Sequence, residues 1–281
     1  MKRILTAIVL IALVGALIFF GKPWMITLLA AIVAGLAAWE FRGFTVAGGC
    51  PLPIWWTFGA IAAFFLAVFY QPDDTITVVS TVTLILFAVA AFRTSLERVL
   101  WETSAGVLML IYVAYPLTLI PKIYNEENGI ALLLFLFLCV WSGDIAALYI
   151  GKRFGKSKLA PHLSPNKTWA GSIASVVASI VFGMAIVLLG DWFSQQGSSF
   201  TSLHTSDPWW VFVLLALLLN VAAQFGDLLE SALKRGAGIK DSGTLLPGHG
   251  GVLDRIDALL MAAPVLWLVI ALLHTFSLGN L

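Results

Sequence analysis

The residues of this chain that could do chemistry are concentrated between Ser231 and Asp257, a stretch that separates two long apolar segments. Its charged and imidazole side chains are Lys234, Arg235, Lys240, Asp241, His249, Asp254, Arg255 and Asp257. Cations can hold phosphates, carboxylates can hold the Mg²⁺ that accompanies a nucleotide, and glycines let backbone N–H groups approach an anion closely. Ionisable groups beside hydrocarbon cost on the order of several kcal/mol unless they are paired, hydrated or ion-bound. The stretch therefore predicts a site for phosphate chemistry.

The apolar segment before this stretch carries polar residues on one helical stripe. Asn220, Gln224, Asp227, Ser231 and Lys234 follow one another at offsets of 4, 3, 4 and 3, which places them on one face of a helix. For Asn220 and Gln224 we expect hydrogen bonds between helices. A carboxylate at position 227 needs a cation, so we predict a metal-binding or catalytic role for Asp227.

Three further acids have competing explanations. Asp144 lies six residues before Ile150, about 9 Å inside a predicted helix end. It is predicted either to form a wall of the same polar site or to pair with a Lys or Arg of a neighbouring helix. Asp254 and Asp257 begin the last apolar segment, where a helix N-cap would explain one acid but not both with Arg255 between them.

Apolar runs of roughly 17–25 residues can span a bilayer, and they occur at 4–20, 23–41, 54–70, 75–92, 103–121, 130–150, 168–190, 209–229 and 258–276. With the N-terminus in the cytoplasm, 14 of the 16 Lys and Arg residues are cytoplasmic and only Lys22 and Lys122 are outside. The positive-inside rule favours this orientation. We expect an all-α polytopic integral membrane protein with about nine transmembrane helices and a cytoplasmic N-terminus.

Composition limits the alternatives. The net charge of +1 gives no sign of a nucleic-acid-binding surface. Cys50 and Cys139 support neither a disulfide nor a zinc site. The segment after Met1 is interpreted as an uncleaved first helix, because no small-x-small cleavage site follows it. We expect a single membrane domain over 1–281, with N-terminal helices in 1–125 and catalytic helices and motif loops in 126–281.

The charged stretch resembles the signature of the phosphatidate cytidylyltransferases, the CDP-diacylglycerol synthases. The matching positions are Ser231, Lys234, Arg235, Lys240, Asp241, Gly243, Pro247, His249, Gly250, Gly251, Asp254, Arg255 and Asp257. Ala38-Trp39-Glu40 and the run 151–171 look like two further blocks of the same family. The resemblance therefore covers the chain in order, most specifically in its second half.

Within the run 151–171, Ser164-Pro165-Asn166-Lys167-Thr168-Trp169 is similar to the family's Ser-Pro-x-Lys-Thr-Trp. Ser164, Lys167 and Thr168 could all address phosphate oxygens. The preceding Gly151–Ser157 is not a P-loop, because three residues separate its glycines where that motif needs four. We expect its basic neighbours to contact anionic headgroups or to set topology; they are Lys152, Arg153, Lys156 and Lys158.

The resemblance implies an enzyme that transfers the cytidylyl group of CTP to phosphatidate, giving CDP-diacylglycerol and pyrophosphate for phospholipid synthesis. It implies Mg²⁺ on Asp227 and Asp254, with Asp144 and Asp257 as weaker ligands and a second cation left open. The other catalytic candidates are Lys240, Asp241 and Arg255. The substrate-binding candidates are Ser164, Lys167, Thr168, Lys234, Arg235, His249, Gly250 and Gly251.

The same resemblance implies contact with membrane lipids, a bacterial inner membrane with the active site facing the cytoplasm, and a homodimer. Two other functions stay open at this point. One is a CTP-dependent transferase or kinase acting on another lipid. The other is an ion-coupled transporter, which would also place Asp144 and Asp227 inside the membrane but would not require so many unlike charges in one cytoplasmic loop. The absence of a convincing internal repeat weakens it.

Overall fold

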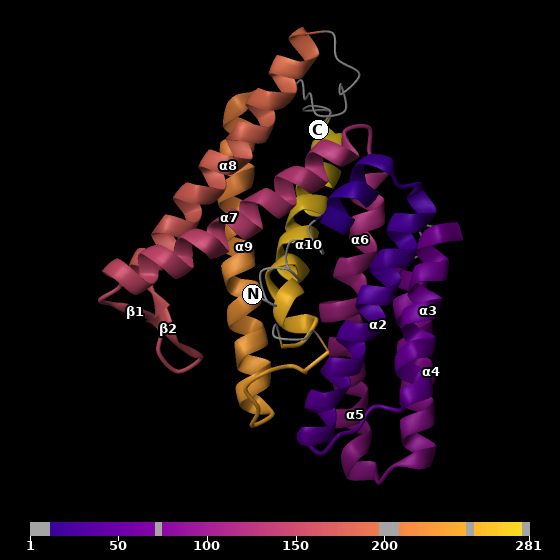
Figure 1. Cartoon of the computed structure of the whole chain (residues 1–281). Coiled ribbons are helices and arrows are strands. Elements are labelled where there is room, and N and C mark those ends of the chain that lie inside the picture. Colours follow the sequence, from indigo (N-terminus) through magenta and orange to yellow (C-terminus); the bar gives the residue numbers. More distant parts are fainter. Residues whose placement is uncertain (1–11, 71–74, 197–207, 246–249, 277–281) are drawn as a thin grey trace. The chain divides into compact units, whose positions relative to one another are not determined.

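The computed structural model describes residues 12–70, 75–196, 208–245 and 250–276 and is almost entirely helical (Figure 1). The helices are α2 (Pro23–Ala47), α3 (Ile54–Tyr70), α4 (Thr75–Arg93), α5 (Leu96–Met109), the π-helical turn η2 (Leu110–Ala114), α6 (Tyr115–Tyr124), α7 (Gly129–Phe154), α8 (Trp169–Gln195), α9 (Trp209–Gly236) and α10 (Leu253–Phe276). Two short strands, β1 (Lys158–Ala160) and β2 (Ser164–Thr168), pair between α7 and α8.

Seven helical stretches of the described chain are long and apolar enough to cross a bilayer. They are Pro23–Ala47, Thr75–Arg93, Leu96–Tyr124, Gly129–Phe154, Trp169–Gln195, Trp209–Gly236 and Leu253–Leu273. The apolar part of α3, Ile54–Ala67, is shorter. The prediction of an all-α polytopic membrane protein is confirmed. Residues 4–11 of the run predicted at 4–20 lie outside the described residues, as do Lys2 and Arg3.

Several helices extend beyond the apolar runs that predicted them. α7 continues to Phe154 and has Lys152 and Arg153 in its last turn, and α9 continues to Gly236 with Lys234 and Arg235 in its last turn. Cations near a helix C-terminus interact favourably with the helix dipole. These four basic residues therefore lie in the last turns of helices and not in the loops that follow.

The chain forms two compact units, each built from two segments. Unit 1 contains residues 1–122 and 232–256, and unit 2 contains residues 123–231 and 257–281. The segment 232–256, which the sequence grouped with the C-terminal helices, thus packs with the N-terminal helices. Each unit contains one of the charged clusters described below.

In unit 2, polar side chains connect α8 and α9. The Asn220 side-chain amide donates to Ser175 Oγ at 2.8 Å and to Ser179 Oγ at 2.7 Å. Gln224 Nε2 donates to Asn220 Oδ1 at 2.6 Å, and Gln224 Oε1 accepts a hydrogen bond of 2.5 Å from Ser172 Oγ of α8. A Cβ at Gly143 of α7 would collide with the Asn220 amide and both serine hydroxyls, so this glycine makes room for the network. The predicted interhelical hydrogen bonding of Asn220 and Gln224 is confirmed.

In unit 1, α2 to α5 pack with one another through apolar side chains and a few polar contacts. Trp56 Nε1 of α3 donates to the Val82 carbonyl of α4 at 3.3 Å. Arg93 at the end of α4 forms an ion pair of 3.3 Å with Glu102 of α5, whose side chain is almost fully buried. Unit 1 therefore already contains one buried acid that is paired within the helix bundle.

Candidate functional site

Unit 2 contains a cavity of about 680 Å³. Its lining residues are Asp144, Ala147, Leu148, Gly151, Lys152, Gly155, Lys158, Leu159, Asn166, Lys167, Thr168, Gly171, Ser172, Ser175, Gln224 and Asp227. They come from α7, the hairpin, α8 and α9. Two carboxylates and three lysines share this space, so the cavity can bind a ligand that carries several negative charges together with a cation.

One stripe of α7 forms a wall of the cavity. Asp144, Leu148, Gly151 and Gly155 recur at helical spacing and all line it. Glycine is required where α7 meets α8, because a Cβ at Gly155 would collide with the Thr168 side chain. The close approach of the helices holds the end of the hairpin against the α7 stripe.

The hairpin delivers residues 166–168 to the cavity. β1 and β2 are antiparallel, with Lys158 opposite Thr168 and Ala160 opposite Ser164. Thr168 is buried and is the N-cap of α8, where its hydroxyl accepts a hydrogen bond of 3.2 Å from the Gly171 N–H. Ser164, a predicted phosphate contact, is not among the described residues that line the cavity.

Lys167 and Asp227 form an ion pair of 2.6 Å inside the cavity. The side chains are 23% and 39% exposed, respectively, so both can be reached by a ligand. Asp144 is also exposed and lines the same cavity. An ammonium group forms charge-assisted hydrogen bonds with phosphate as well as with carboxylate, so Lys167 can exchange Asp227 for a phosphate while Asp227 takes a cation.

The acids of this cavity fit the ligand preferences of Mg²⁺. Mg²⁺ in nucleotide sites is usually held by one or two carboxylates together with substrate phosphates and water. Asp144 and Asp227 supply two carboxylates in one cavity. No cluster of three or more His, Cys, Asp or Glu residues positioned for a metal occurs in the part of the chain described here.

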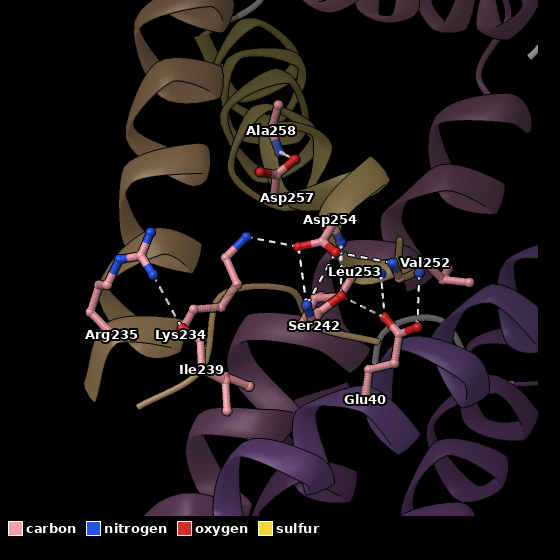
Figure 2. Close-up of polar contacts among 11 residues, drawn as sticks. Glu40, Lys234, Arg235, Ile239, Ser242, Val252, Leu253, Asp254, Asp257 and Ala258 are labelled. Carbon is pink, nitrogen blue, oxygen red and sulfur yellow. Dashed lines mark hydrogen bonds and ion pairs between the residues drawn. The ribbon is translucent and has the colours of Figure 1, made fainter. Parts of the chain in front are cut away.

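The second charged cluster lies in unit 1 and is centred on Asp254, in the first turn of α10 (Figure 2). Its carboxylate accepts hydrogen bonds from Lys234 Nζ at 2.7 Å, from the Ser242 N–H at 3.1 Å and from the Gly251 N–H at 3.0 Å. The Asp254 and Lys234 side chains are only 11% and 13% exposed. Asp254 thus holds the loop before α10 as well as a lysine of α9.

Glu40 of α2 completes this cluster (Figure 2). It is 3% exposed, and its carboxylate accepts hydrogen bonds from Ser242 Oγ at 2.9 Å, the Val252 N–H at 2.9 Å and the Leu253 N–H at 2.8 Å. We call Glu40, Ser242, Asp254 and Lys234 the Glu40 network. Sequence reasoning gave Glu40 no role, although a single acid inside an otherwise apolar run was the available signal.

The other predicted residues of unit 1 are on the surface of the loop or near it. Lys240, Asp241 and Arg255 are exposed. Arg235 is also exposed and donates to the Ile239 carbonyl at 3.3 Å. Gly250 adopts a left-handed φ of 81°, a conformation that favours glycine.

Asp257 and His249 are the remaining predicted site residues. In unit 2, Asp257 accepts a hydrogen bond of 2.8 Å from the Ala258 N–H and is not among the described residues that line the cavity. His249 lies outside the described residues, as does Gly248.

Lys152 and Lys158, for which the sequence predicted headgroup contact or a role in topology, are further candidates for the functional site. Both line the cavity with Asp227. The spacing contained a signal for Lys152, which follows Asp144 by two helical turns of α7. Lys158 is brought to the cavity by the hairpin, which no apolar alternation predicted.

The fold and the cavity define a polytopic helical membrane protein with a site suited to phosphorylated ligands. The sequence matches the cytidylyltransferase family over residues 1–273. The chain therefore belongs to the cytidylyltransferase family.

Among its relatives, the phosphatidate cytidylyltransferase of Haemophilus influenzae is 31% identical, and the alignment covers 94% of this chain and 96% of that protein. The phosphatidate cytidylyltransferase of Staphylococcus epidermidis is also 31% identical, with the same coverage. The phosphatidate cytidylyltransferase of Brucella suis is 43% identical over 59% of this chain. In that alignment the chain spans about half, 55%, of the relative's length.

Proposed function

We propose that this protein transfers the cytidylyl group of CTP to phosphatidate, giving CDP-diacylglycerol and pyrophosphate. The observation that carries the proposal is the unit 2 cavity, in which Asp144 and Asp227 lie with three lysines in a chain of the cytidylyltransferase family. Both proposed substrates are phosphate esters, and their negative charges need the cations that the cavity provides. The names of the full-length relatives support the choice of CTP and phosphatidate.

The reaction requires little proton transfer. The phosphate of phosphatidate is already an anionic nucleophile near neutral pH. One of its oxygens attacks the α-phosphorus of CTP, and a new P–O bond forms as the bond to the bridging oxygen breaks and pyrophosphate leaves. The protein must align two anions and neutralise the charge of the transition state and the leaving group.

Lys152, Lys158 and Lys167 are proposed to contact the phosphates, because all three line the cavity. Lys167 is already oriented by its ion pair with Asp227. When phosphates enter, the lysine can turn to them without leaving a desolvated charge behind, provided that Asp227 takes a cation. The Lys167–Asp227 pair therefore keeps both side chains inside the cavity until substrate arrives.

Mg²⁺, when bound, would neutralise nucleotide phosphates and stabilise the leaving pyrophosphate. Asp227 is the proposed ligand that the cavity geometry supports best, with Asp144 beside it. Asp254 stays a prediction from the family resemblance. Its carboxylate already accepts hydrogen bonds from Lys234 and two backbone amides, so an ion would share it with these donors.

The protein is an integral membrane protein, and we propose a bacterial inner membrane with the active site facing the cytoplasm. The distribution of Lys and Arg residues along the chain supports this orientation. CTP is a cytoplasmic metabolite, and phosphatidate presents its phosphate at the headgroup plane. The homodimer implied by the resemblance stays a prediction.

The test is incorporation of radiolabelled CTP into lipid by the purified protein in phosphatidate-containing vesicles. We expect labelled CDP-diacylglycerol only with phosphatidate and a divalent cation. Diacylglycerol should not replace phosphatidate, because it lacks the nucleophilic phosphate. Conversion of diacylglycerol would instead favour a lipid kinase, and full turnover in excess EDTA would exclude the role of a divalent cation.

A further inference from the structure

Glu40 is the most deeply buried acid of the loop cluster in unit 1. It lies in the apolar helix α2 and is 3% exposed. A carboxylate at such a position is costly unless its oxygens are hydrogen-bonded. Here Oε1 accepts from the Val252 N–H, and Oε2 accepts from the Leu253 N–H and Ser242 Oγ. Each carboxylate oxygen of Glu40 therefore has a hydrogen-bond donor within the protein.

The donors come from a distant part of the sequence. Val252 is 212 positions from Glu40, and it directly precedes the first residue of α10, Leu253. The first N–H groups of a helix have no partner within the helix and carry a partial positive charge. Glu40 therefore acts as an external cap for α10, from a helix near the other end of the sequence.

Two glycines make room for this contact. A Cβ at Gly243 or Gly251 would collide with the Glu40 carboxyl group, and a Cβ at Gly251 would also collide with Ser242 Oγ. These glycines belong to the charged stretch that the sequence singled out. Their surroundings give them a packing role around a buried carboxylate.

Ser242 connects Glu40 to Asp254 (Figure 2). The Ser242 hydroxyl donates to Glu40 and accepts a hydrogen bond of 3.3 Å from the Asp254 N–H. The Ser242 N–H donates to the Asp254 carboxylate, which also binds Lys234. A displacement of Glu40 would thus reach Asp254 and Lys234 through Ser242 and through the backbone of residues 252 and 253.

We propose that Glu40 is a positioning residue, which fixes residues 242 and 250–254 so that Asp254 and Lys234 are held in a productive arrangement for nucleotidyl transfer. Glu40 itself touches no substrate in this role. The part of the inference that concerns catalysis rests on the proposed function. The part that concerns the loop is independent of it and can be measured without substrate.

The test compares Glu40→Gln with Glu102→Gln in the full-length protein. Glu102 is a matched control, because it lies in the same unit, is also 3% exposed and is paired with Arg93 outside the network. Gln keeps the volume of Glu40, but its NH₂ group faces N–H donors that need an acceptor. Hydrogen–deuterium exchange should increase at residues 242–245 and 250–254 in Glu40→Gln and stay at the wild-type level there in Glu102→Gln.

In the kinetic arm, Glu40→Gln should lower kcat by about tenfold to a hundredfold, the cost of a small misplacement of reacting groups. The KM for CTP should change by less than about threefold, because Glu40 contacts no substrate and only transition-state alignment is lost. Glu40→Asp keeps the charge and should retain more activity than Glu40→Gln. Glu102→Gln should retain the wild-type kcat.

A double-mutant cycle of Glu40→Gln and Ser242→Ala tests whether the two residues act together. Because they act through one network, the double variant should lose little more kcat than the worse single variant.

Unchanged exchange in Glu40→Gln overturns the positioning role whether or not the enzyme uses CTP. Increased exchange with a wild-type kcat, or additive losses in the cycle, overturns its link to catalysis. If the wild-type protein fails to use CTP and phosphatidate, the proposed function fails and the exchange result still decides the loop contact.

Discussion

The Asp227 side chain in the unit 2 cavity is 39% exposed and is paired with Lys167, whereas the Asp254 side chain in unit 1 is 11% exposed and accepts hydrogen bonds from a lysine and two backbone amides. Both acids are aspartates that the resemblance to one enzyme family predicts as metal ligands. Their surroundings nevertheless differ, because one faces an open cavity and the other holds a loop. An acid with few protein partners can serve a ligand, and an acid with many also stabilises the fold. Substitutions should separate these two uses.

The largest effect is expected for Asp227→Asn. The amide keeps nearly the same volume and can still hydrogen-bond, but it removes the charge that faces Lys167 and the proposed Mg²⁺. We expect the rate of CDP-diacylglycerol formation to fall by about a hundredfold or more, or roughly 3 kcal/mol, as when one preorganised transition-state contact is lost. Because the site is open, the melting temperature in detergent should change little. Near-normal activity would remove Asp227 from the site.

Asp254→Asn should also lower activity by about a hundredfold, but it should cost stability as well. Lys234 loses its charged partner in a largely buried position, and hydrogen bonds to charged groups contribute about 1.5–3 kcal/mol. Thermal unfolding of Asp254→Asn beside Asp227→Asn measures the difference. Equal melting temperatures in the two variants would show that Asp254 contributes no more to stability than Asp227.

The double variant Asp227→Asn with Asp254→Asn tests whether the two acids act as a unit. The family resemblance predicts that both acids serve one metal, so the double variant should be little less active than the worse single variant, because residues that act as a unit give non-additive losses. Rates of the four proteins at saturating substrate provide the measurement. Multiplicative losses would indicate two separate roles.

Asp257→Asn should lower activity less than either single substitution, since Asp257 is not among the described residues that line the cavity.

Smaller effects are expected for the lysines of the cavity. Lys152→Gln and Lys158→Gln each remove an exposed cation, and exposed charge pairs contribute about 0.2–1 kcal/mol. We expect each to raise the KM for CTP by up to about fivefold, with Lys156→Gln as the control because Lys156 is not among the described residues that line the cavity. An equal change in all three variants would support the headgroup role that the sequence suggested.

Thiol labelling tests the orientation of the chain in the membrane without a measurement of activity. In a background without Cys50 and Cys139, a cysteine in place of the exposed Thr244 should react with an impermeant thiol reagent only from the cytoplasmic side. A cysteine in place of the exposed Asn125 should react only from the outer side. The charge asymmetry of the sequence is the reason for both expectations. Labelling of both from one side would contradict the predicted topology.

The class of fold follows from the sequence alone. Apolar runs of bilayer length predict helices because the chain must satisfy its backbone hydrogen bonds within each segment in lipid. The offsets along α9 likewise predicted the stripe that places Asn220, Gln224 and Asp227 on one face, because a helix fixes which residues share a face. These are local properties, so the sequence of a single segment is enough to predict them.

Which polar residues meet depends on how the segments pack in three dimensions. Lys158 reaches the cavity because a hairpin folds back between α7 and α8, and Glu40 reaches Val252 across 212 positions because α2 packs against the start of α10 in unit 1. Such contacts depend on how separate segments pack, and neither helical spacing nor composition specifies that. Glu40 and Asp227 are both single acids within apolar segments of the sequence. Packing places Glu40 against the loop before α10 and Asp227 in the cavity.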